Sequence, residues 1–150
     1  MSLLKTITVI IMVLITINVK SQTANDSIQM KQAALDYIEG WFYKDAARVD
    51  KAVHFEFVKR SIFSGDSIDF LRTINKSRMD YITLYHPDRD YSLHTEVIIL
   101  DATSTVASVK LIFNECIEYL HVAKLNGRWL IVNNLFTVNP DYLLKNLNFD

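Results

Sequence analysis

The clearest pattern of apolar and polar positions lies between Glu118 and Phe136, where two mostly apolar segments flank Asn126 and Gly127. Asn-Gly is the strongest short signal for a β-hairpin, because both central residues of a type I′ turn need a positive φ. This turn fixes a register for the two strands. One face then carries Glu118, Leu120, Val122, Trp129, Ile131 and Asn133, and the other carries Tyr119, His121, Ala123, Leu130, Val132, Asn134 and Phe136. Both faces are mostly apolar, so we expect both to be covered.

Helical spacing of apolar residues predicts three helices before the main part of the sheet. The first covers residues 27–45 with Asn25 or Asp26 as its N-cap, and Gly40 within it indicates a close approach by another segment. Asp45 caps a second helix over residues 46–53. Asp66 caps a third helix over residues 67–82.

Period-two alternation and β-branched or aromatic residues predict further strands at residues 54–63, 93–100 and 106–115. Asn139 and Pro140 are typical of the start of a short closing helix over residues 141–147. Helices grouped against one face of a curved antiparallel sheet make an α+β domain.

The chain starts with a basic segment, an apolar run of 14 residues and a polar exit, which is the layout of a signal peptide. Val19 and Ser21 provide the small residues that predict cleavage after Ser21. The run is shorter than the about 20 residues of a membrane span, although an uncleaved anchor is the alternative. We therefore expect a secreted or periplasmic protein with no membrane attachment after cleavage.

The remaining domain, residues 22–150, is acidic. Removal of Lys5 and Lys20 lowers the basic count from 16 to 14 against 17 acidic residues. No cluster of Lys and Arg is dense enough for nucleic acid. Cys116 is the only cysteine, so packing and not disulfide bonds must hold the domain together. Its acidic neighbours favour a buried thiol over a nucleophile.

Two groups of segments resemble the lumazine-binding family of the nuclear transport factor 2-like (SnoaL-like) superfamily: ALDYIEGWFYKDAARVDKAVH with FVKRSIF, and VASVK with EYLHVAKLNGRWLIVNNLF. The most specific parts are Tyr37, Gly40, Trp41 and Asp45 and the hairpin, and Glu118 stands where such proteins more often carry Asp. The resemblance implies a cone-shaped fold, with three helices on a curved sheet, a pocket between them and frequent homodimers. The superfamily contains isomerases, dehydratases, cyclases and non-catalytic binding domains, so the fold alone does not give the function.

The predicted register places Glu118 on the concave face of the sheet. A buried carboxylate is costly unless it is paired or has a use, so Glu118 is the catalytic candidate, and its alternative is a solvated position at the rim. The other pocket candidates share polar or aromatic character and a predicted position near the concave face: Tyr37, Trp41, His54, Trp129 and Asn133. For Tyr37, Trp41 and His54 the alternative is a structural role.

The sequence predicts no cofactor and no metal. The loop residues His86, Asp88, Asp90 and His94 are ligand types, but a solvated turn explains them as well. Lys59 and Arg60 are adjacent on a strand, so at most one can reach a pocket. For the partner we expect a second copy, bound through the convex face by Tyr119, Leu130, Val132 and Phe136.

Two functions remain open. The first is a non-catalytic domain that binds a small hydrophobic or aromatic molecule. The second is an isomerase-like or dehydratase-like enzyme with Glu118 as general base and Tyr37 or His54 as hydrogen-bond donor. We favour binding, because the predicted pocket has few polar groups.

Overall fold

The computed structural model describes residues 24–64, 68–114 and 116–138. The predicted cleavage site after Ser21 and the predicted helix over residues 141–147 lie outside these ranges. The first helix includes residues 24–42. The elements that follow are α2 (Ala46–Ala52), β1 (Val53–Ser64), β2 (Asp69–Asn75), α3 (Lys76–Tyr85), β3 (Thr95–Ala102), β4 (Val106–Phe113), β5 (Cys116–Leu125) and β6 (Arg128–Val138). Within the described ranges, no helix has the length and hydropathy needed to cross a bilayer.

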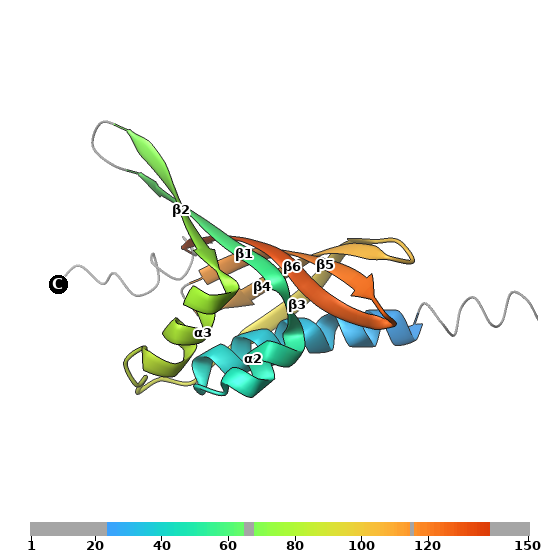
Figure 1. The fold of residues 1–150 in the computed structure, drawn as a ribbon, viewed down its shortest axis with the longest axis horizontal. Coiled ribbons are helices and arrows are strands. Elements are labelled where there is room, and N and C mark those ends of the chain that lie inside the picture. The colour runs from blue at the N-terminus through green and yellow to red at the C-terminus, as the bar shows by residue number, and fades with distance from the viewer. Residues whose placement is uncertain (1–23, 65–67, 115, 139–150) are drawn as a thin grey trace, which may run out of the picture.

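The strands form one curved, unclosed sheet in the order β2-β1-β6-β5-β4-β3. Neighbouring strands are antiparallel except for β1 and β6, which are parallel. The described helices lie on one face of the sheet, and the β1–β2 hairpin projects away from the rest of the domain (Figure 1). The predicted α+β architecture is therefore confirmed.

The core lies between the inner face of the sheet and the helices. The first helix contributes Ala34, Tyr37 and Ile38, all almost fully buried. The strands contribute alternate residues, as expected for a sheet that buries one face. These are Phe57, Ala107, Val109, Leu111, Phe113, Leu120, Val122, Trp129 and Ile131.

Three sequence signals are confirmed in detail. Asn126 and Gly127 have φ values of 51° and 78°, and Leu125 pairs with Arg128 across a two-residue turn. A Cβ on Gly40 would lie 2.8 Å from the backbone nitrogen of Val49, so only glycine lets α2 approach the first helix this closely. Asp45 caps α2 as predicted, because its side chain accepts a hydrogen bond from the Arg48 amide at 3.0 Å.

The predicted helix over residues 67–82 is wrong in its first half. Residues Asp69–Asn75 form β2, which pairs with the second half of β1, and α3 begins only at Lys76. The side chain of Asn75 accepts a hydrogen bond from the Arg78 amide at 2.9 Å and so caps α3. Of the apolar residues that suggested a helical stripe, Ile68 and Leu71 are exposed, whereas Met79, which does lie in α3, is buried in the core. In this segment, pairing with the long β1 strand determines the conformation, and the helical spacing of its apolar residues does not.

A β-bulge changes the predicted faces of β6. Val122 pairs with Ile131 but His121 pairs with Asn133, so Val132 is the extra residue. Beyond the bulge, each β6 side chain lies on the opposite face from the one that an uninterrupted register predicts. Asn134 and Phe136 therefore lie on the inner face, and Asn133 and Leu135 lie on the outer face. The prediction that Asn133 lines the interior and that Phe136 belongs to the convex face is wrong for this reason.

Candidate functional site

A buried polar cluster occupies the inner face of the sheet. We define it as Tyr37, Lys59, Glu118 and Asn134, which come from the first helix, β1, β5 and β6. Tyr37, Glu118 and Asn134 are almost completely buried, and the Lys59 side chain is 14% exposed. The prediction that Glu118 points inward is confirmed, and its alternative position at a solvated rim is wrong.

Hydrogen bonds connect all four members. Lys59 Nζ forms an ion pair with Glu118 Oε1 and donates to the Tyr37 hydroxyl at 3.2 Å. Asn134 Nδ2 donates to Glu118 Oε2 at 2.5 Å and to the Tyr37 hydroxyl at 3.0 Å. The Lys59 ammonium also lies 4.8 Å from the centre of the Phe136 ring. Both carboxylate oxygens of Glu118 are thus occupied by donors.

The electrostatics of the cluster favour a charged lysine and a neutral tyrosine. Burial alone would lower the pKa of Lys59, but the charge of Glu118, together with Tyr37 and the hydrogen bonds, outweighs burial and raises this pKa. Burial, and next the negative charge of Glu118, raise the pKa of Tyr37 well above its ordinary value. A carboxylate that neutralises a buried ammonium is a poor general base, because taking up a proton would leave that ammonium unpaired.

Among the described residues, Asn134 Oδ1 is the buried side-chain atom that lacks a hydrogen-bond partner. Sequence reasoning missed Asn134, because the Asn133-Asn134 pair puts one amide on each face and only the bulge decides which one is inside. The prediction that at most one of Lys59 and Arg60 reaches the interior is confirmed, because Lys59 belongs to the buried cluster. Arg60 points outward and donates to Asn133 Oδ1 at 2.7 Å.

The other predicted pocket residues lie apart from the cluster. Trp129 pairs with Lys124 at the turn end of the hairpin, and its indole donates to Asp26 Oδ1 at 3.0 Å. His54 is the second residue of β1 and contacts Phe55 and Glu56. Asn133 is on the outer face beside His121. Of the predicted set, the structure brings only Tyr37 and Glu118 together.

Trp41 belongs to a second region, at the end of the first helix. Its backbone oxygen lies 2.7 Å from His86 Nε2, and its ring lies against the rings of His86 and Phe113. His86 is buried and so fastens the loop after α3 to the first helix. The prediction that this loop is solvated is therefore wrong for His86, although Asp88 and Asp90 are exposed.

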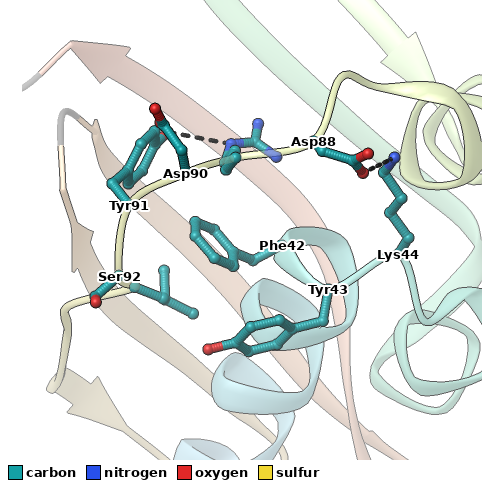
Figure 2. A pocket seen from close by; sticks show the side chains of 9 residues that line it. Phe42, Tyr43, Lys44, Asp88, Asp90, Tyr91 and Ser92 are labelled. Carbon is teal, nitrogen blue, oxygen red and sulfur yellow. Dashed lines mark hydrogen bonds and ion pairs between the residues drawn. The ribbon is translucent and has the colours of Figure 1, made fainter.

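An open cleft of about 660 Å³ lies between the end of the first helix and this loop. We call it the helix-end cleft. Phe42 and Tyr43 lie between an ion pair of Lys44 with Asp88 at one end and Tyr91 with Ser92 at the other (Figure 2). The lining residues are Phe42, Tyr43, Lys44, Asp88, Arg89, Asp90, Tyr91, Ser92 and Leu93. The volume falls within the range typical of sites for small molecules.

The backbone at the end of the first helix positions the Lys44 end of the cleft. Lys44 has a φ of 60°, in the left-handed region that favours glycine. The Asp45 amide donates to the Gly40 carbonyl at 2.8 Å, and the Lys44 amide donates to the Trp41 carbonyl at 3.4 Å. This is the hydrogen-bond pattern of a Schellman motif, which ends the helix and turns the chain toward α2.

The described residues contain no group of three or more His, Cys, Asp or Glu side chains that could hold a metal ion. In the loop that sequence reasoning considered for a metal, His86 binds the Trp41 carbonyl and Asp88 pairs with Lys44. What the loop contributes is instead one wall of the helix-end cleft.

Comparison with solved structures shows a nuclear transport factor 2-like fold. A protein of unknown function with this fold from Shewanella baltica superposes with a TM-score of 0.69 at 12% identity, covering 78% of this chain and 96% of that one. A second, from Methylobacillus flagellatus, gives 0.62 at 18% identity, covering 77% and 93%. A ketosteroid isomerase-like protein from Erwinia carotovora gives 0.55 at 12% identity, covering 74% and 94%. No family model matches the sequence, and no match to a curated protein is found.

Proposed function

We propose that this chain is a small-molecule-binding domain that does not catalyse a reaction, and that the helix-end cleft holds its ligand. The observation that carries the proposal is the cleft itself, which is open, large enough for a small molecule and lined by aromatic and charged side chains. Proteins of this fold include several of unknown function, so the fold is compatible with the proposal but does not decide it.

The alternative is an enzyme with Glu118 as general base, in line with the isomerase-like name of one structural neighbour. The geometry of the polar cluster weighs against it. A general base must be able to take a proton from the substrate, whereas Glu118 already accepts from Lys59 and Asn134. We therefore assign the cluster a structural role, in which it joins the first helix to β1, β5 and β6.

Native mass spectrometry of the protein purified from its own cells, with identification of the small molecules released, tests the proposal. Tyr43→Ala removes an exposed ring from the cleft, and Tyr37→Phe alters only the buried cluster. We expect a bound molecule that is lost from Tyr43→Ala and kept by Tyr37→Phe. A molecule that remains on Tyr43→Ala and is lost from Tyr37→Phe would move the binding site to the interior of the cone and overturn the assignment to the cleft.

We further propose that the protein is exported, with residues 1–21 as its signal peptide and residues 22–150 as the mature domain. The support comes from the short apolar run and the small residues before the expected cut. N-terminal sequencing of exported protein should begin at Gln22. Membrane-bound material that retains Met1 would indicate an uncleaved anchor.

A further inference from the structure

We propose that the helix-end cleft binds an uncharged saccharide, an inference that rests on the small-molecule-binding function proposed above. Three properties of the cleft lead to this ligand class: its charges cancel, its aromatic rings are exposed at two places, and its walls are fastened to each other before any ligand arrives.

The charged side chains of the lining sum to zero. Lys44 and Arg89 are cationic, and Asp88 and Asp90 are anionic. Lys44 is paired with Asp88, and the two aspartates flank Arg89 in the chain. An anionic or cationic ligand would therefore meet charges of both signs at short range. Sugar hydroxyls both donate and accept, so they can use the remaining hydrogen-bond capacity of ammonium, guanidinium and carboxylate groups together.

The aromatic residues provide surfaces for the carbon-bound hydrogens of a sugar ring. Phe42 is buried and makes edge-to-face contacts with Tyr43 at 5.1 Å and with Tyr91 at 5.7 Å between ring centres. Phe42 thereby supports two rings that are themselves open to solvent, since Tyr43 is 65% and Tyr91 39% exposed. An exposed tyrosine ring offers a large apolar surface to the apolar side of a sugar ring, and the charged side chains of the lining can serve its hydroxyl groups.

Arg89 holds the two walls together. Its guanidinium carbon lies 4.0 Å from the centre of the Trp41 ring, its Nε donates to the Tyr91 hydroxyl at 3.1 Å, and its Nη1 lies 2.9 Å from His86 Nδ1. His86 in turn binds the Trp41 carbonyl. The loop and the helix end are therefore already in place before a ligand binds. Ordering of these two segments then takes less from the binding free energy, which matters for a flexible sugar that binds weakly.

Saturation-transfer NMR and calorimetric titration with maltose, cellobiose, lactose and chitobiose at millimolar concentrations test the ligand class. Lumazine and benzoate form the comparison panel of planar aromatic compounds. The cleft variant is Tyr43→Ala, with Tyr43→Phe as the conservative variant. Tyr85→Ala is the matched control, because Tyr85 is 69% exposed on α3 and does not line the cleft.

We expect at least one saccharide to bind, roughly tenfold more weakly to Tyr43→Ala than to the wild type, with Tyr43→Phe and Tyr85→Ala unchanged. Binding of lumazine or benzoate alone, with the same dependence on Tyr43, would overturn the saccharide inference and leave the proposed function intact. Failure of both panels to bind, or binding that Tyr43→Ala does not weaken, would overturn the inference and the assignment of the cleft together.

Discussion

Lys59 and Glu118 form an ion pair in the interior of the domain, where the Glu118 carboxylate is fully buried and the Lys59 ammonium reaches it from β1. The pair joins two strands that β6 separates, because β1 pairs with β6 and β6 pairs with β5. A buried ion pair of this kind is costly to break from one side, because the remaining charge has neither water nor a partner.

Glu118→Gln should therefore destabilise the protein by about 3–5 kcal/mol, because it leaves the Lys59 ammonium buried without its partner. Chemical denaturation measures the free energy of unfolding. The double variant Lys59→Met/Glu118→Gln should recover a large part of the loss, whereas equal stability of Glu118→Gln and wild type would mean that the pair does not form.

The polar cluster should make the protein sensitive to alkali. The pKa of Tyr37 is raised by burial and by Glu118, so the folded phenol keeps its proton where the unfolded phenol ionises, and stability falls as the pH rises above about 10. The raised pKa of Lys59 acts in the same direction, since its contribution is lost as the pH rises through the folded value. Thermal melts between about pH 8 and pH 11 should show a shallower loss for Tyr37→Phe than for the wild type. Parallel slopes of melting temperature against pH for the two proteins would show that burial does not keep Tyr37 protonated at a pH where an exposed tyrosine ionises.

Gly127→Val should destabilise by more than about 1 kcal/mol, because a β-branched residue is strained at a φ of 78°. A Cβ at this position would meet no other atom within 4 Å, so the expected loss comes from the backbone conformation and not from a clash. Thermal melts of Gly127→Val and Gly127→Asn separate the two causes, since asparagine tolerates the left-handed region. An unchanged melting temperature for the valine variant would contradict the two-residue turn.

The outer face of the sheet should form a homodimer, because the described helices lie on the inner face and leave Tyr119 and Leu135 about 40% exposed on the outer one. Leu135 replaces Phe136 in the predicted interface as a consequence of the β-bulge. Light scattering should give a dimer for the wild type and a monomer for the double variant Tyr119→Glu/Leu135→Glu. Ile28→Glu, at an exposed position on the first helix, is the control that should remain dimeric. A monomeric wild type at micromolar concentration would contradict the prediction.

Sequence reasoning succeeded where a feature depends on neighbouring residues. The Asn126-Gly127 turn, the Asp45 cap and the close approach at Gly40 each follow from local backbone chemistry. It failed where distant segments decide the outcome. Residues Asp69–Asn75 have helical apolar spacing but form a strand, because β1 offers them an edge to pair with.

The candidate site shows the same limit. Glu118 was identified from the hairpin register, which holds as far as the pair of Val122 with Ile131. The bulge at Val132 then exchanges Asn133 and Asn134, and no residue type in this stretch requires a bulge. The helix-end cleft could not be predicted either, because it forms only when the loop after α3 folds back on the end of the first helix.

The left-handed backbone at Lys44 sets two requirements against each other at a single position. Glycine there would relieve about 1 kcal/mol of backbone strain and give the helix a more favourable end. The same change would remove the ammonium that pairs with Asp88 and closes one end of the cleft. Improving the stability of this helix end and keeping the binding surface are therefore competing aims, and any attempt to engineer a more robust variant of the domain has to choose between them at residue 44.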